Sequence, residues 1–538
     1  MQFGQPRKQL PRQTALTAAL MAAMAIGGGS AIYSRSAEAF GSASTVSHTS
    51  RSSARAVQPN AGATYEVTSC ADDGSAGTLR YVIENNAVAD SDTVDLSTLP
   101  CSTITLTNGQ IVIPQSNFSL VTTKGVTIDA NSKSRVIEHI GTGGLLFIQG
   151  VTLSNGYVKY NSSTGVEKGG CLLSNGNIFL MTSQLSNCHA INVDGEVLGG
   201  AMYVAGQVQL TDSTITHGYA EGIQALGGGV FNGSSMTVAG STVRFNTVAT
   251  TDANNTSSLA RGGGIFSEGA VDIEQSDATS NRAIGQKGSA DGGGVNAQGG
   301  LTLFYSVITG NTATATASGA GGAYAKGRSY IFDATIDHNQ SVNNSALVFT
   351  GGSSSFVNID NSTISTNAAT TGSSTIFASI PINIHNTTIA FNTSAGTSAG
   401  IYLYPGGTLL LESTIIANNK STGSSAGFDI VARAAITGSH NLVRAPQSAG
   451  SVPGDTLIGV DPLLEPLAVN GNTLGSALTH ALAPTSPAVD RGTDTRTFSK
   501  DERGYPRVYG LSADIGAYEW QGDDTDTIFK NGFEVNIN

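Results

Sequence analysis

A phrase repeated between Gly262 and Asn418 limits the fold of this chain more than any other feature. Each copy carries glycines, two apolar residues separated by one position, a Ser or Thr, and an Asn five residues later. Successive copies lie roughly 25 to 35 residues apart, a period typical of stacked repeats. With the Ser or Thr as position zero, the copies place Ser183, Ser213, Ser241, Ser276, Ser306, Ala334, Ser362, Thr387 and Ser413 there.

Apolar residues around position zero alternate with mostly polar residues. In the copy at Ser306, for example, Leu303 lies three residues before it and Ile308 two residues after it. A period of two is typical of a strand with one buried face. One coil cannot bury that face alone, so neighbouring coils must stack. The pattern therefore predicts an all-β fold, a parallel β-solenoid.

The Asn of each copy occupies one offset in consecutive coils. The residues at this offset are Asn246, Asn281, Asn311, Asn339, Asn367, Asn392 and Asn418. Asn amides stacked in a file can form a ladder of hydrogen bonds. Asn also tolerates the left-handed backbone of a tight corner, so we expect these residues to form one corner and glycines another.

The N-terminal segment predicts export. The chain has 538 residues, with 27 basic and 39 acidic side chains, and this balance argues against nucleic acid or an anionic membrane as partner. Residues 1–39 resemble a signal peptide, with a basic start, an apolar run over 15–26 that is too short to span a bilayer, and Ala37-Glu38-Ala39 as cleavage site. Residues 40–62 are rich in Ser and Ala and are typical of a linker. No later stretch predicts a transmembrane helix.

Four cysteines fit an oxidising compartment. Of the three pairings, we favour Cys70 with Cys101 and Cys171 with Cys188; unpaired buried thiols are the alternative. A helix predicted over 78–86 lies between the first two and should cap the open end of the solenoid. The Cys and His spacings do not match a zinc site, and we predict no metal or cofactor.

The repeat ends near residue 445. We assign 63–445 to the solenoid, 446–520 to a loop-rich region interrupted by prolines, and 521–538 to an acidic tail. Asp523, Asp524 and Asp526 in that tail offer calcium ligands, but a solvated tail is the simpler interpretation.

Two phrases near the C-terminus resemble a known group of proteins. Ser486-Pro487-Ala488-Val489-Asp490 and Asp514-Ile515-Gly516-Ala517-Tyr518-Glu519 are similar to the C-terminal region of secreted bacterial choice-of-anchor Q domain proteins. Gly77-Thr78-Leu79-Arg80 resembles their N-terminal capping motif, and the repeats are similar to those of polymorphic outer-membrane proteins. The resemblance implies a right-handed parallel β-helix of roughly a dozen coils, located outside the cell or on the outer-membrane surface of a bacterium, and adhesive.

Candidate functional residues lie in the outward column two positions before zero. The column contains Glu274, Phe304, Phe332, Asp360 and His385, and Asp272, Tyr305 and Tyr330 lie beside it. The aromatic residues predict a face that grips a ligand. Asp272, Glu274, Asp360 and His385 form a catalytic alternative, in which Asp272 and Glu274 lie about 6.6 Å apart along one strand and suit an inverting hydrolase. No Arg or Lys falls in this column to neutralise an acidic sugar, as a lyase would require.

These observations predict an exported, non-catalytic β-helix protein that adheres through its lateral face. Its partner would be a surface glycan or a protein of a host or neighbouring cell. A carbohydrate-active enzyme, a carbohydrate-binding rod and a structural spacer are the alternatives, because this fold hosts several functions. The sequence leaves the ligand, the mode of attachment and the oligomeric state open.

Overall fold

The computed structural model describes residues 62–251, 255–372, 374–423, 427–448, 450–472 and 477–522. The predicted signal peptide, nearly all of the linker and the acidic tail from Asp523 onward lie outside these residues. Apart from Thr495–Ser499, the described residues belong to one compact unit. None of the helices in this part of the chain is long and apolar enough to cross a membrane.

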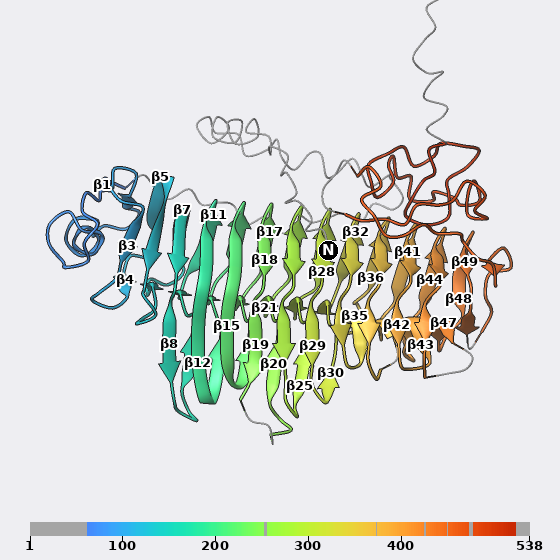
Figure 1. Cartoon of the computed structure of the whole chain (residues 1–538), viewed down its shortest axis with the longest axis horizontal. Coiled ribbons are helices and arrows are strands. Elements are labelled where there is room, and N and C mark those ends of the chain that lie inside the picture. Colours follow the sequence, from blue (N-terminus) through green and yellow to red (C-terminus); the bar gives the residue numbers. More distant parts are fainter. Residues whose placement is uncertain are drawn as a thin grey trace, which may run out of the picture. The chain divides into compact units, whose positions relative to one another are not determined.

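The predicted parallel β-solenoid is confirmed. Its coils stack in sequence order (Figure 1). The strands form two sheets, and each coil contributes one strand to the second sheet, which has 13 strands within the described residues. The strands of this second sheet are β4 Ile111–Ile113, β6 Ile137–His139, β10 Leu172–Ser174, β13 Met202–Val204, β16 Val230–Asn232, β21 Ile265–Ser267, β26 Val295–Ala297, β31 Ala323–Lys326, β35 Asn344–Thr350, β39 Ser374–Ala378, β43 Ser398–Leu403, β47 Phe428–Ala432 and β50 Pro446–Ser448.

The first sheet contains the strands that carry the predicted site. Its lateral strands are β5 Phe118–Asp129, β7 Leu145–Ser154, β11 Asn177–Met181, β14 Val208–Thr211, β17 Met236–Ala239, β22 Val271–Glu274, β27 Leu301–Phe304, β32 Ser329–Phe332, β36 Val357–Asp360, β40 Ile382–His385, β44 Leu409–Glu412 and β48 Ile436–Ser439. After the next corner follow β18 Thr242–Arg244, β23 Asp277–Thr279, β28 Val307–Thr309, β33 Thr335–Asp337, β37 Thr363–Ser365, β41 Thr388–Ala390, β45 Ile415–Ala417, β49 Leu442–Val443 and β51 Leu457–Ile458. Strand pairing therefore continues past residue 445.

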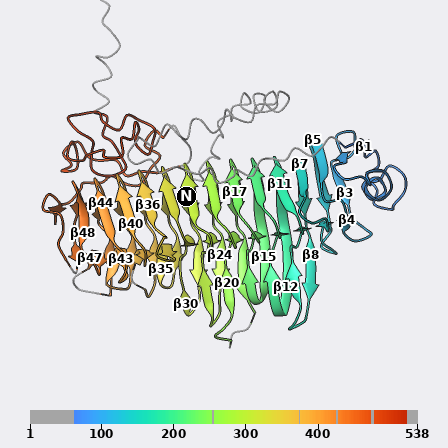
Figure 2. The ribbon, with the colours of Figure 1, turned by 180° about the vertical axis from the view of Figure 1, so that it is seen from behind.

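The third segment of each coil forms a thin extension in the middle of the solenoid, visible below the main body from β8 to β30 (Figures 1 and 2). Its core is built mostly from alanines, such as Ala220, Ala260 and Ala290, because two sheet layers meet there at close distance. The strands are β8 Tyr157–Tyr160, β9 Val166–Lys168, β12 Gln184–Leu198, β15 Thr214–Leu226, β19 Thr247–Thr250, β20 Leu259–Arg261, β24 Arg282–Ile284, β25 Ser289–Asp291, β29 Thr312–Thr314, β30 Ala317–Ser318, β34 Gln340–Ser341, β38 Ala368–Ala369, β42 Thr393–Ser394 and β46 Lys420–Ser421.

The solenoid core consists of apolar side chains stacked in files. The register places Leu303, Ile331, Ile359, Ile384 and Leu411 above one another, all buried. β-Branched and aliphatic residues suit this half-buried pleated surface. Burial of such a file stabilises the stack by roughly 1.5–3 kcal/mol per side chain.

Asn side chains form a ladder along one corner. Asn246, Asn281, Asn311, Asn339, Asn367 and Asn392 lie in one file, and each accepts from or donates to its neighbours through its side-chain amide. From Asn281 onward, each Oδ1 accepts both the backbone N–H and the Nδ2–H of the preceding member, and Asn246 Oδ1 accepts from the backbone N–H of Gly218. The buried polar groups of every corner are thereby satisfied.

The sequence prediction for this ladder was wrong at two points. The last Asn of the file is Asn419, which accepts from Asn392, and not Asn418. Adjacent Ser413-Thr414 and Asn418-Asn419 allow two alignments, and strand pairing of Ile382 with Leu409 selects the one shifted by one residue.

The left-handed corner is also not formed by the ladder Asn. The residue before it has positive φ in each coil, as at His338 (54°), Phe391 (57°) and Asn418 (60°). The amide of the ladder Asn is therefore required for hydrogen bonding, and the conformational strain falls on its neighbour.

The N-terminal end has the predicted cap and disulfides. Strand β1 Thr64–Glu66 pairs with β2 Thr93–Asp95, and β3 Thr103–Thr105 follows. Between β1 and β2 lie α2 Leu79–Tyr81 and the π-helix η1 Val82–Asn86, whose apolar residues enter the core. Disulfides join Cys70 to Cys101 and Cys171 to Cys188, as predicted.

The region after β51 has little regular structure, as predicted. Only isolated antiparallel bridges occur in it within the described residues, such as Leu464 with Leu482. It lies against the corner strands β33, β37, β41 and β45, through contacts described below.

Candidate functional site

The lateral column predicted from the sequence exists in the structure. Pairing of β22, β27, β32, β36, β40 and β44 places Glu274, Phe304, Phe332, Asp360 and His385 in one file. The file continues to Glu412, which pairs with His385. Sequence analysis missed Glu412 because the alignment of that coil was one residue off.

The first half of this file and the residues beside it form a surface of rings and carboxylates, in which Phe332, predicted as a ligand contact, is buried. Asp272 and Glu274 are exposed on β22, and Phe304, Tyr305 and Tyr330 are half-buried. The rings contact one another, with distances measured between ring centroids. Phe304 stacks on Phe332 at 5.3 Å, Phe304 meets Tyr305 edge-on at 4.3 Å, and Tyr330 meets Phe356 edge-on at 5.6 Å. Offset and edge-on pairs of this kind hold the rings in fixed positions.

Electrostatics of this half are set by partial burial. Burial raises the pKa of the Glu274 carboxyl. Burial, and after it the neighbouring Asp333 carboxylate, raises the pKa of the Tyr305 hydroxyl, so this phenol remains protonated and can donate a hydrogen bond.

The second half of the file is closed. Asp360 Oδ1 and His385 Nδ1 are 2.7 Å apart, and both residues are buried. Glu412 Oε2 lies 3.7 Å from His385 Nε2, so both ring nitrogens face carboxylates. A general acid or base must come within hydrogen-bond reach of its substrate. Catalysis by Asp272, Glu274, Asp360 and His385 together stays a prediction, and the geometry brings only the first two of them to the surface.

A serine–histidine contact that the sequence did not predict joins the loop region to the solenoid. Ser365 Oγ on β37 lies 2.8 Å from His480 Nε2, and His480 Nδ1 lies 2.7 Å from the carbonyl oxygen of Glu465. Burial lowers the pKa of His480, which favours the neutral ring. Ser365 is 0% exposed, so a substrate carbonyl cannot reach it and the contact acts as a latch.

A second latch is made by buried carboxylates. Glu502 accepts hydrogen bonds from the hydroxyls of Thr335 on β33 and Thr363 on β37. Nearby, Asp333 accepts from Asn361 Nδ2. Burial raises the pKa of both carboxyls well above the ordinary range. The two Glu502 contacts span 167 and 139 residues of sequence, and no local motif signals them.

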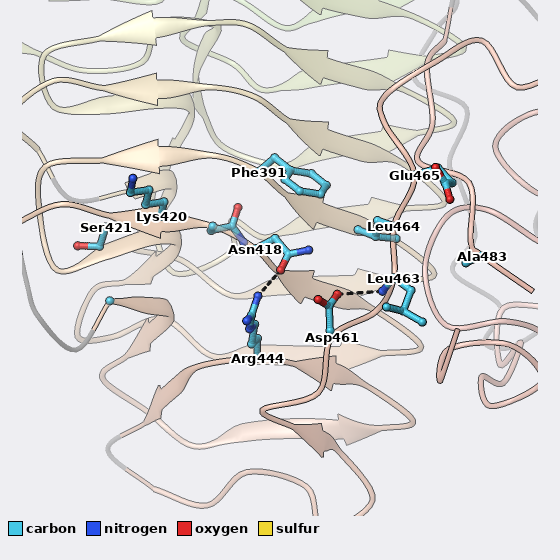
Figure 3. A pocket seen from close by; sticks show the side chains of 12 residues that line it. Phe391, Asn418, Lys420, Ser421, Arg444, Asp461, Leu463, Leu464, Glu465 and Ala483 are labelled. Atoms are coloured by element: carbon cyan, nitrogen blue, oxygen red, sulfur yellow. Dashed lines mark hydrogen bonds between the residues drawn. The ribbon is translucent and has the colours of Figure 1, made fainter. Parts of the chain in front are cut away.

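An open depression lies where the loop region meets the last coils (Figure 3). Its volume is about 810 Å³. Arg444 Nη1 donates to Asn418 Oδ1, and Asp461 Oδ1 accepts from the backbone N–H of Leu463. The residues that line it are Phe391, Asn418, Asn419, Lys420, Ser421, Gly427, Arg444, Asp461, Leu463, Leu464, Glu465 and Ala483. The sequence analysis did not identify this site, because its walls come from segments that meet only in the fold.

Clustered metal ligands are not found among the described residues. The calcium interpretation of Asp523, Asp524 and Asp526 lies outside them and stays a prediction.

Comparison with known proteins assigns the chain to no family. No protein-family model matches the chain, and no curated protein matches it. Among solved structures, the crystal structure of pectate lyase Pel9A is similar, with 12% identity, a TM-score of 0.35, and coverage of 86% of this chain and 97% of that one. A likeness at this level carries no information on activity. The resemblance to choice-of-anchor Q domain proteins therefore stays a prediction, and the chain is established as a parallel β-solenoid.

Proposed function

We propose that this chain is an exported, non-catalytic binding protein that adheres to a surface glycan through its lateral strip, which we define as Asp272, Glu274, Phe304, Tyr305 and Tyr330. One observation supports this most. Rings from two successive coils, Phe304 and Tyr305 on one and Tyr330 on the next, are fixed by ring contacts and remain half-buried, with two exposed carboxylates beside them.

The chemistry of the strip suits a sugar polymer. Adjacent coils are about 4.8 Å apart, which is comparable to the length of one sugar residue. Aromatic faces pack against the C–H face of a sugar ring, and carboxylates accept from its hydroxyls. Beyond Tyr330 the same row continues with Asn358 and Asn383, whose side chains share a hydrogen bond of 3.0 Å.

Export is the second part of the proposal. Two disulfides form most readily in an oxidising compartment. We expect N-terminal sequencing of the fractionated mature protein to begin at Phe40, with the protein outside the cytoplasm. A cytoplasmic protein that begins at Met1 would count against export.

Binding of the purified protein to immobilised polysaccharides and to intact cells tests the function. We expect Tyr330→Ala and Phe304→Ala to weaken retention, because each removes a ring face. The matched control is Tyr324→Ala on β31, in the other sheet. Equal loss in the control, or no loss in the strip variants, would refute the assignment, and binding abolished by protease treatment of the cells would indicate a protein partner.

A glycan hydrolase is the second candidate, favoured by one observation. Asp272 and Glu274 project from the same face of β22, with backbone positions about 6.6 Å apart along the strand, a spacing that allows the carboxyl separation of an inverting pair. Release of reducing ends that is lost in Glu274→Gln would establish hydrolysis. Binding without turnover supports adhesion, and neither binding nor turnover supports a spacer.

A further inference from the structure

The depression near Asn418 is separate from the lateral strip and has a composition of its own. Its polar lining contains two cations, Lys420 and Arg444, and two carboxylates, Asp461 and Glu465. All four residues are exposed, and within the described residues none of them forms an ion pair. Figure 3 shows Lys420 and Arg444 on one side of the depression and Glu465 on the other. With two positive and two negative side chains, the lining has no net formal charge.

This arrangement selects a ligand by its hydrogen-bonding groups. Lys and Arg side chains only donate, and ionised Asp and Glu only accept. An anionic ligand would face Asp461 and Glu465, and a cationic ligand would face Lys420 and Arg444. A hydroxyl both donates and accepts, so a neutral polyhydroxylated ligand can satisfy all four groups at once.

Besides the charged groups and Asn418, Asn419 and Ser421, the lining has an apolar part. Phe391, Leu464 and Ala483 line it, together with Leu463, which is 41% exposed. Leu463 also has a φ of 51°, a conformation that is rare for a large side chain. Apolar and aromatic walls combined with a few polar groups are typical of ligand sites, and such a wall suits the C–H face of a sugar ring.

We propose that this depression binds a short neutral oligosaccharide. Its hydroxyls bridge the cations Lys420 and Arg444 to the carboxylates Asp461 and Glu465, and one ring lies on Phe391 and Leu464. The volume of about 810 Å³ is within the range of small-molecule sites and accommodates more than one sugar ring. This proposal does not depend on the lateral strip.

Calorimetric titration and saturation-transfer NMR of the full mature chain test it. The probes are the tetrasaccharides of cellulose, xylan, amylose and chitin, with tetragalacturonate as the acidic counterpart. We expect saturable binding of at least one neutral probe and weaker binding of tetragalacturonate. The double variant Lys420→Ala/Glu465→Ala should lower affinity about tenfold or more. Both side chains are exposed, so the variant is expected to fold.

Controls separate this site from the strip. Lys326→Ala removes an exposed cation of β31 that does not line the depression, and it should leave the affinity unchanged. The proposal is overturned if no neutral probe binds, if tetragalacturonate binds more tightly, or if the double variant binds like wild type. Loss of binding in Tyr330→Ala alone would assign the ligand to the strip and overturn the pocket.

Discussion

Replacement of Asn311 by alanine removes one member from the middle of the Asn ladder. Asn311 is fully buried. Its Oδ1 accepts from the backbone N–H of Asn281 at 2.9 Å and from Asn281 Nδ2 at 3.0 Å. Its Nδ2 donates to the carbonyl oxygen of Ala278 at 2.9 Å and to Asn339 Oδ1 at 3.0 Å. The substitution therefore deletes four hydrogen bonds.

The expected cost follows from these contacts. A net contribution of about 1 kcal/mol per hydrogen bond gives about 4 kcal/mol. The Asn281 backbone N–H loses its acceptor in a buried position, while Asn281 Nδ2 still donates to the Val243 carbonyl and Asn339 Oδ1 still accepts from the backbone N–H of residue 311. We therefore expect Asn311→Ala to lower the free energy of unfolding by roughly 3–5 kcal/mol.

Urea unfolding followed by circular dichroism measures the change, and hydrogen exchange in β28 and β29 localises it. The matched control is Asn418→Gly. Asn418 has positive φ, which Gly adopts readily, and it lies outside the ladder, so the cost should stay below about 1 kcal/mol. A loss below about 1 kcal/mol for Asn311→Ala, or equal losses in the two variants, would refute the role of the ladder.

Three further changes have expected outcomes. Burial raises the pKa of Asp429, which ends the ladder, to about 6, and that of Glu519 to about 7. The destabilisation caused by each buried carboxylate is therefore absent below the pKa of the unfolded chain and grows as pH rises through the folded value. Urea titrations from pH 4 to 8 should show Asp429→Asn gaining up to about 3 kcal/mol in free energy of unfolding relative to wild type, and a constant difference would contradict this. Ser365→Ala removes the partner of His480 and should speed limited proteolysis of the loop region while the solenoid stays intact; unchanged cleavage would show that this latch is dispensable. Cys188→Ser removes the Cys171–Cys188 disulfide, whose sequence separation is 17, and should lower the free energy of unfolding in urea by about 2–4 kcal/mol relative to wild type; under reducing conditions this difference should vanish.

The sequence predicted the solenoid because its signal is periodic. The apolar files, the stacked Asn residues and the order of Glu274, Phe304, Phe332, Asp360 and His385 all follow from spacing, since coils of parallel strands place like offsets above one another. Where two adjacent residues fit one offset, spacing alone could not decide. Because of this ambiguity, the sequence analysis assigned Asn418 to the ladder in place of Asn419 and did not include Glu412 in the outward column.

The tertiary contacts that bury these residues, and the depression, could not be predicted from spacing. The latches of His480 and Glu502 and the depression around Asn418 join segments far apart in sequence, with no shared period. Likewise, alternation shows that Asp360 points outward, but it does not show that Asp360 is buried against His385. Burial at these positions depends on tertiary contacts that local patterns do not encode.

The affinity of the mature protein for fragments of its polysaccharide ligand, measured against fragment length, tests the central claim most directly. If the strip residues on the successive strands β22, β27 and β32 form the binding surface, each added sugar residue should meet one more coil. Affinity should then rise with length until the strip from Glu274 to Tyr330 is covered, and the rise should disappear in Tyr330→Ala. An affinity that does not depend on fragment length, or a rise that is the same in Tyr330→Ala, would contradict binding by the lateral strip.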